Sequence, residues 1–299
     1  MAWFIYALLG HFLYSLVTVS NKFLLRQQAT TRPLVFTFWV SSFSIFTLVL
    51  APFGLNWPGF GWLAFDILTG AIYFFALWAF YKALDINEVS RSASFIGGIT
   101  PILVLVFSYL FLGETLGWTQ LLAFLLLVAG GFLISFERSA DGFKEKHKGI
   151  NFVVLAIVLH AVYYVMLKYL FDGQNFITGF IWSRLGMAVV ALAVLFYPAW
   201  RKMIFGSARE ATASVSYLMI GSKIAAGFGS LFVSLAVSMG NVSLVNALQG
   251  AQFVFLFLLI VLLSKFWPAV CREKASGAIM AQKFAAIALI CVGLALIAW

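Results

Sequence analysis

Residues 94–117 read SFIGGITPILVLVFSYLFLGETLG and combine an apolar run, an internal Pro101 and a polar end at Gly113-Glu114-Thr115. The apolar run is continuous and has the length, about 20 residues, that a helix needs to cross the hydrocarbon of a bilayer. A strand of an outer-membrane barrel would instead alternate between apolar and polar residues. The stretch therefore predicts a membrane-spanning helix that ends at a polar turn.

The rest of the chain repeats this pattern from end to end. Of 299 residues, 64% are hydrophobic and 10% are charged, and the mean hydropathy of +1.04 is far above that of a soluble domain. We therefore expect an all-α integral membrane protein with about ten transmembrane helices. The first helix is expected to stay in place, because it has neither a basic leader nor a cleavage site. The expected spans are 3–25, 34–53, 62–84, 89–112, 117–137, 150–171, 175–198, 213–237, 242–264 and 280–298.

The basic residues are distributed unevenly over the connections between these spans. The even-numbered connections hold only Lys168, and Lys22, Arg184 and Lys223 lie inside helices. By the positive-inside rule, the odd-numbered connections face the cytoplasm and both termini lie outside. The net charge of +9 is thus a topology signal rather than a sign of nucleic-acid binding. The other 15 of the 19 basic residues lie in or beside the odd-numbered connections: Arg26, Arg32, Lys82, Arg91, Arg138, Lys144, Lys146, Lys148, Arg201, Lys202, Arg209, Lys265, Arg272, Lys274 and Lys283.

The chain also divides into two similar halves. The most polar segment, 138–149, separates residues 1–137 from residues 150–299, and each half contains five expected spans. NEVSRSASFIGG from residue 87 aligns with GNVSLVNALQGA from residue 240, and the spacing from Gln120 to Gly131 recurs from Gln282 to Gly293. An odd number of helices per copy gives the two copies opposite orientations, so we expect two inverted five-helix repeats. This geometry suits transport by alternating access.

With these residues in view, positions 87–135 resemble the signature of the EamA-type families of the drug/metabolite transporter superfamily. The resemblance rests on Pro101 in the fourth helix, on Gly113-Glu114 after it, and on a fifth helix with Gln120 and late glycines. It implies a ten-helix transporter and favours export. Relatives are usually drawn with cytoplasmic termini, whereas the charge distribution of this chain predicts the reverse.

We interpret the signature as structural, because the second copy lacks it. There the corresponding stretch reads LLSKFWPAVCREKASG, with Val254 in place of Pro101 and no acid at the helix end. Glu114 is expected to cap the N-terminus of the next helix. Pro101 is expected to kink or thin its helix near the membrane centre.

Two cations lie near the middle of expected spans, where an ionisable side chain is costly and normally faces a cavity or a partner. They are Arg184 in the seventh span and Lys223 in the eighth. Two buried cations predict an anionic ligand. The alternative is a structural role for each, in which it binds backbone carbonyls or helix ends.

Aromatic residues could form the walls of such a site. Trp39 and Trp182 align between the halves and are the preferred candidates. The alternative is ordinary packing or an interfacial aromatic belt, since 18% of the residues are aromatic. The tyrosines that could also line a cavity are Tyr14, Tyr73, Tyr163 and Tyr164.

Lysines near helix ends permit two interpretations. Lys22, near the end of the first span, is a candidate for substrate binding but could equally extend to the lipid headgroups. Lys168 lies near the end of the sixth span beside Asp172, and we expect an interfacial ion pair between them.

Three further residues are candidates for proton coupling. His160 lies about mid-membrane in the sixth span and is also a candidate substrate contact, His11 lies in the first span, and Asp66 lies one turn into the third. Imidazole titrates near neutral pH. The alternative for a membrane histidine is a neutral hydrogen-bonding role.

Signatures of enzymes and of ATP-driven machines are missing from the sequence. It has no phosphate-cradling loop, no HExxH and no cysteine cluster, and its cysteines, Cys271 and Cys291, do not have metal-ligand spacing. We expect no catalysis, cofactor, metal or nucleic-acid partner. The predicted function is secondary transport of a small organic anion or amino acid by alternating access in the inner (plasma) membrane. The alternatives are a membrane scaffold without transport and a flippase for a lipid-linked substrate.

Overall fold

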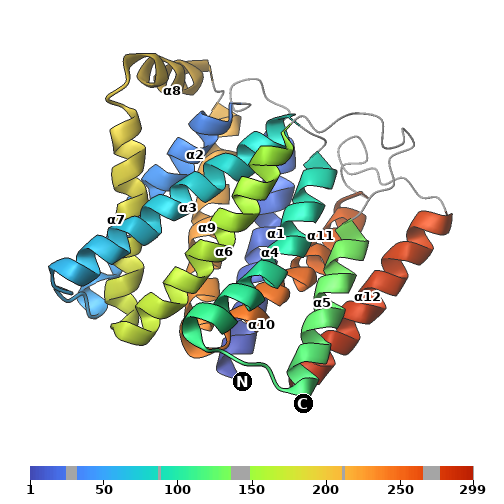
Figure 1. Cartoon of the computed structure of the whole chain (residues 1–299). Coiled ribbons are helices and arrows are strands. Elements are labelled where there is room, and N and C mark those ends of the chain that lie inside the picture. Colours follow the sequence, from blue (N-terminus) through green and yellow to red (C-terminus); the bar gives the residue numbers. More distant parts are fainter. Residues whose placement is uncertain (25–31, 87–88, 136–148, 211–212, 265–276, 299) are drawn as a thin grey trace.

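The computed structural model describes residues 1–24, 32–86, 89–135, 149–210, 213–264 and 277–298. Within these residues there is no strand, and ten helical segments are long and apolar enough to cross a membrane, which confirms the predicted all-α membrane fold (Figure 1). The helices are α1 (Ala2–Leu24), α2 (Pro33–Ser42), the 3-10 helix η2 (Phe43–Phe53), α3 (Phe60–Ile86), α4 (Val89–Leu112), α5 (Trp118–Ser135), α6 (Ile150–Gly173), α7 (Phe176–Val194), α8 (Pro198–Glu210), α9 (Ala213–Met239), α10 (Val242–Ala247), α11 (Gln249–Ser264) and α12 (Gly277–Ala298).

The second expected span, 34–53, is not a uniform α-helix. It begins as α2 with a proline in its first turn, where the missing N–H costs nothing, and continues from Phe43 as the 3-10 helix η2. An 11-residue 3-10 helix is unusually long, and such segments often mark strain or a hinge. The Ser44 hydroxyl lies 2.8 Å from the carbonyl oxygen of Arg184, so this tighter segment is tied to α7.

The ninth expected span, 242–264, is broken into two helices at Leu248. The first, α10, has only six residues, and all of them are buried. Asn241 caps its N-terminus, because its side-chain oxygen accepts hydrogen bonds from the N–H groups of Ser243 (2.9 Å) and Leu244 (3.2 Å). Leu248 itself keeps α-helical dihedral angles (φ −61°, ψ −10°), so the interruption is local and the two helices form one apolar span of 23 residues.

Residues 198–210 form a helix where we expected a connection. Figure 1 shows α8 lying crosswise at one upper corner of the bundle, above the end of α7 and on the side of the odd-numbered connections. Its Ile204 is fully buried, whereas Trp200, Arg201 and Lys202 are exposed. An apolar inner face combined with exposed aromatic and basic residues is typical of a helix at the membrane surface.

Helices of the first half pack against helices of the second half in matching pairs. α1 packs against α9, and the matching α6 packs against α3. α1 also packs against α11 as α6 packs against α4, and the last helices of the halves, α5 and α12, pack against each other. This pattern of contacts is the one that two copies of one five-helix unit would be expected to give.

A glycine contact brings α1 and α9 together. A Cβ atom at Gly10 would lie 2.9 Å from the carbonyl oxygen of Gly229 and 2.6 Å from Cγ2 of Val233. Because small residues let helix backbones approach closely, this contact sets the spacing of the two helices.

The stretch at 94–117 forms the expected helix and turn. α4 continues through Pro101 to Leu112, and Gly113 follows with a φ of +69°, a left-handed conformation that favours glycine and ends helices. The connection then runs to α5. The proposed boundary between the halves, the linker 138–149, lies outside the described residues except for Gly149, and so does Cys271.

Candidate substrate site

Arg184 lies midway along α7, and its side chain joins three helices. α7 starts after Asn175, whose side chain accepts a hydrogen bond from Ile177 N (2.8 Å), and Arg184 lies more than two turns further along. Its side chain is 7% exposed. Nη2 donates to Tyr163 Oη of α6 (3.0 Å) and to Ser230 Oγ of α9 (2.5 Å). The guanidinium is therefore held where helices of the second half meet.

Aromatic rings surround this guanidinium. Its Cζ atom lies 5.0 Å from the ring centre of Tyr73, which comes from α3 in the first half, and 5.2 Å from that of Phe180. The Tyr73 and Tyr163 rings stack with their centres 4.1 Å apart. Cation–π attraction is strongest at such desolvated positions. The aromatic rings thus stabilise the positive charge of Arg184 but do not neutralise it.

The charge of Arg184 has no anionic partner among the described residues. No carboxylate of that part of the chain lies within 4.0 Å of it, and the buried Nε atom has no hydrogen-bond partner there. A buried charge without a counterion is costly, so an unpaired guanidinium N–H in this place suits an oxygen of an incoming anion.

Lys223 is the second deep cation. It lies on α9, seven residues before Ser230, and is 5% exposed. Its Nζ atom lies 3.8 Å from the ring centre of Phe36 on α2. In the described part of the chain it forms no ion pair with a carboxylate. The two residues predicted to bind an anion, Arg184 and Lys223, are therefore both buried, and each lies over an aromatic ring.

The two candidate tryptophans have other neighbours. Trp182 Nε1 donates to the carbonyl of Asn56 (3.4 Å), and its ring meets Trp57 edge to face at 6.1 Å, both in the connection between η2 and α3. Trp39 on α2 contacts Phe38, with ring centres 5.3 Å apart. The rings that contact Arg184 are those of tyrosine and phenylalanine.

The two histidines differ in what they bind. His160 Nδ1 donates to the carbonyl of Ala156 in its own helix (2.8 Å), and its ring meets the edge of Tyr73 at 6.1 Å. His11 Nε2 instead donates to the carbonyl of Val245 in α10 (3.2 Å), and His11 Nδ1 is buried with no partner in the described structure. His11 thus connects α1 of the first half to the broken span of the second half.

Asp66 and Lys22 complete the set of predicted residues. Asp66 is fully buried in α3, and its Oδ1 accepts a hydrogen bond from Gln174 Nε2 at the end of α6 (2.7 Å). This bond joins the two halves. Lys22 lies in the last turn of α1, and its side chain is outside the described part of the structure.

Glu114 has a different role from the one predicted. Its Oε2 accepts a hydrogen bond from Val242 N (3.2 Å) and so caps α10 of the other half, not the next helix, α5. At α5, Gln120 Oε1 accepts the bond from Gly117 N (3.1 Å) in the manner of a capping box. The expectation that Glu114 caps the next helix was therefore wrong, because a glutamine already fills that place.

Polar contacts around Glu114 link the halves at the side of the even-numbered connections. Lys168 Nζ lies 2.9 Å from Asp172, which confirms the predicted ion pair, and 4.0 Å from Glu114. Ser108 of α4 and Ser243 of α10 share a hydrogen bond of 2.8 Å. Burial raises the pKa of Glu114 above its usual value, although the Val242 N–H and Lys168 act in the opposite direction.

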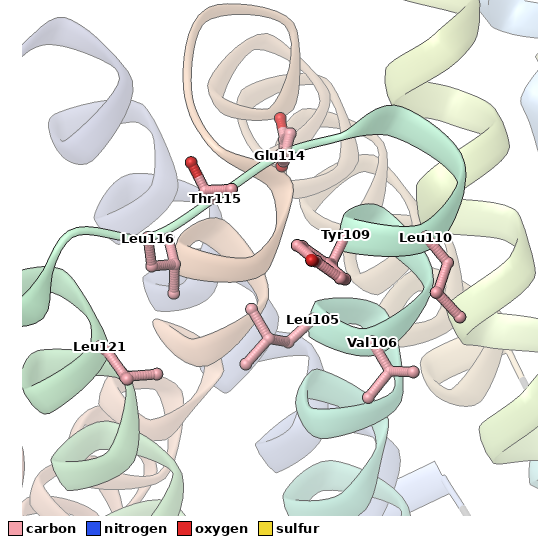
Figure 2. Close-up of a pocket in the computed structure, with 8 residues that line it drawn as sticks. All are labelled: Leu105, Val106, Tyr109, Leu110, Glu114, Thr115, Leu116 and Leu121. Atoms are coloured by element: carbon pink, nitrogen blue, oxygen red, sulfur yellow. The ribbon is translucent and has the colours of Figure 1, made fainter.

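Two cavities lie on this same side, away from Arg184. The first has a volume of 390 Å³ and lies between the end of α4 and the start of α5 (Figure 2). The second, of 650 Å³, lies between the starts of α1 and α5, α10 and the end of α12. Arg184 and Lys223 line neither of them. The residues around the first cavity are Leu105, Val106, Tyr109, Leu110, Glu114, Thr115, Leu116 and Leu121.

Metal-ligating residues do not gather in the described part of the chain. It holds no group of three or more histidine, cysteine, aspartate or glutamate side chains that could bind an ion. Cys291 is a free, exposed cysteine.

Comparison with known proteins agrees with this architecture. Residues 1–136 match the model of the EamA-like transporter family. Among 28 matching chains of solved structures, one described as "Crystal structure of protein" is 19% identical, with a TM-score of 0.66 over 98% of this chain and 94% of that chain. At this identity the likeness shows the fold alone. The comparison with curated proteins gave no significant match.

Proposed function

We propose that the chain, whose residues 1–136 match the model of the EamA-like transporter family, moves a small organic anion, or an amino acid held by its carboxylate, across the membrane. The family match and the ten apolar helices of the described residues support a multi-pass membrane protein and a secondary transporter of the drug/metabolite type. Its substrate is a small molecule. The substrate charge, the site and the cycle are the proposed part.

The observation that carries the proposal is the environment of Arg184. A guanidinium that is 7% exposed lies between the halves, touching Tyr73 of one and Tyr163 and Ser230 of the other. Its buried Nε has no partner in the described structure. A substrate carboxylate would supply the missing acceptor and counter-charge, and a neutral or cationic substrate would supply neither.

The proposed cycle is alternating access of the two inverted repeats in an inner (plasma) membrane, with both termini outside and net export. The matching helix pairs across the halves support this cycle. Lys223 would be the second cationic contact, and Trp39, Trp182, His160 and Lys22 stay candidates for the approach to the site. For proton coupling, His11, His160 and Asp66 are the proposed carriers.

A ligand screen on the purified chain tests the proposal. A ligand that binds only the folded state raises the melting temperature with concentration. Organic anions and amino acids should stabilise the wild type, and amines and neutral sugars should not. Arg184→Met should lose this response while its melting temperature without ligand shows that it still folds. Stabilisation by amines or sugars alone, or an unchanged response in the variant, would contradict an anion site.

One observation favours the flippase as a second candidate. The cavity of Figure 2 is bordered by Tyr109 and Leu110, which are 60% and 63% exposed on a face of the bundle that meets lipid. A lipid-linked substrate would reach the protein from this lipid-facing side. Proteoliposome assays separate the candidates, because a transporter of soluble anions accumulates a labelled anion, a flippase moves a long-chain carrier, and a scaffold moves neither.

A further inference from the structure

Arg184 and Lys223 each lie on an aromatic ring, and these rings belong to one wall. The Arg184 Cζ atom is 5.0 Å from the ring centre of Tyr73 on α3, and the Lys223 Nζ atom is 3.8 Å from that of Phe36 on α2. The Phe36 ring meets Tyr81 of α3 edge to face, with ring centres 4.6 Å apart. The two cations therefore lie at opposite ends of an aromatic wall formed by Phe36, Tyr81 and Tyr73.

Two helices give similar lengths for this wall. Tyr73 and Tyr81 are eight residues apart on one face of α3, which corresponds to about 12 Å along the helix. Ser230, which accepts a bond from Arg184, is seven residues from Lys223 on α9, or about 10 Å. Between the tyrosines, Leu77 makes the middle of the face apolar. The site thus has a cation at each end and an apolar centre.

Neither end is neutralised by the protein described here. No carboxylate of the described chain lies within 4.0 Å of either cation. The side chains of Arg184 and Lys223 are 7% and 5% exposed, and Arg184 Nε has no partner. A substrate with a single negative charge would compensate one cation and leave the other uncompensated in a low-dielectric region.

Building on the proposed function, we infer that the substrate carries two anionic groups, one bound by Arg184 and the other by Lys223, on an apolar or planar body that lies along the aromatic wall. Short flexible dicarboxylates of different lengths, such as succinate, glutarate and adipate, are the simplest ligands with this pattern of charges.

The two ends differ chemically. Nη2 of Arg184 donates to both Tyr163 and Ser230, which fixes the orientation of the guanidinium and leaves Nε, without a partner in the described structure, as a donor for one carboxylate. Lysine is a compact charge on a flexible stem, so it accepts anionic groups at slightly different distances. We therefore expect several chain lengths to bind, with one carboxylate always at Arg184.

A matched series of carboxylates tests this inference. Succinate, glutarate and adipate are each compared with the monocarboxylate of the same carbon number, by calorimetry at neutral pH on the full purified chain. We expect about tenfold or greater preference for each dicarboxylate, because the second carboxylate adds a charge-assisted contact. In Lys223→Met the ratio of the two affinities should fall to about one, whereas Lys223→Arg should keep it well above one. Lys202→Met, on the exposed face of α8, is the matched control and should keep the wild-type ratio.

The outcomes separate this inference from the proposed function. If wild type binds monocarboxylates as tightly as the matched dicarboxylates, the two-point inference is wrong and the anion site stands. If Lys223→Met weakens both series by the same factor, or Lys223→Arg loses the preference completely, Lys223 is not the second contact and the inference is also wrong. If neither series binds to folded wild type, both the inference and the anion site are overturned.

Discussion

Replacing Glu114 tests one of the hydrogen bonds that join the two halves of the bundle. Its Oε2 accepts a hydrogen bond from the N–H of Val242 at the start of α10, and the side chains of Glu114 and Lys168 are only 16% and 12% exposed. Loss of a side-chain cap at a helix N-terminus costs about 0.5–2 kcal/mol. We therefore expect Glu114→Ala to lower the free energy of unfolding by about 1–2 kcal/mol.

Glu114→Gln separates the cap from the charge. Glutamine keeps an oxygen that can accept from Val242 N, and it removes a carboxylate whose pKa is raised because burial outweighs its favourable contacts. A neutral side chain of the same shape is often no worse than a buried charge. The expected loss for this variant is therefore below about 0.5 kcal/mol.

The pH dependence has a definite sign. A raised pKa means that folded Glu114 binds its proton more readily than unfolded Glu114, whose usual pKa is 4.5. Relative to Glu114→Gln, the wild type should lose stability as the pH rises from below 4.5 through the raised pKa of the folded state. Outside this pH range, the difference in unfolding free energy between wild type and Glu114→Gln should be small and should not change with pH.

The assay is reversible unfolding of wild type and both variants in mixed detergent micelles across pH. Gln120→Ala, which removes the cap of α5 without touching the bond between the halves, is the control for general loss of a helix cap. A Glu114→Ala variant as stable as wild type would refute the cross-half cap. Equal losses in the alanine and glutamine variants would show that the charge, and not the hydrogen bond, stabilises this contact.

Three further predictions follow from the site, the packing and the charge distribution. Arg184→Lys should weaken anion binding at least about tenfold, because an ammonium cannot bond Tyr163 and Ser230 and still present a fixed planar donor to the anion, and binding that is unchanged by calorimetry would show that any cation suffices at this position. Gly10→Ala should cost about 1–3 kcal/mol in unfolding, because its Cβ would lie 2.9 Å from the Gly229 carbonyl oxygen, whereas Gly221→Ala, with no atom within 4 Å, should cost nothing. A single cysteine placed beside Met1 in a cysteine-free variant should react with a membrane-impermeant maleimide added to intact cells. Reaction only after lysis would show that the N-terminus lies in the cytoplasm and that the predicted topology is wrong.

The sequence allowed us to predict what depends on local composition. Continuous apolar runs specify the spans, and Arg184 and Lys223 stand out because charges are rare at that depth. The breaks within spans were not predictable in the same way. Both η2 and the region around Leu248 consist of ordinary apolar residues. The hydropathy of a sequence does not depend on whether it folds as an α-helix, a 3-10 helix or a broken helix.

The partners of the site residues were missed for a different reason. Glu114 and Val242 are 128 residues apart, so only the three-dimensional packing identifies the helix that Glu114 caps. The tyrosines around Arg184 could be named as candidates but not selected, because 33 phenylalanines, 10 tyrosines and 10 tryptophans offer many equivalent choices. Ser230 and Phe36 gave no signal, since a serine and a phenylalanine in a membrane helix are ordinary.

The contacts between the halves are concentrated on one side of the bundle, and this matters for alternating access. Glu114 caps α10, Ser108 bonds Ser243, and His11 donates to Val245, so three points of the first half hold one buried six-residue helix of the second. In a rocking cycle, bonds that join the repeats on one side must break when that side opens. In this structure the three bonds are formed. A variant that weakens them, such as Glu114→Ala, should therefore shift the population toward opening on that side, and its loss of stability and its gain in accessibility should have the same cause.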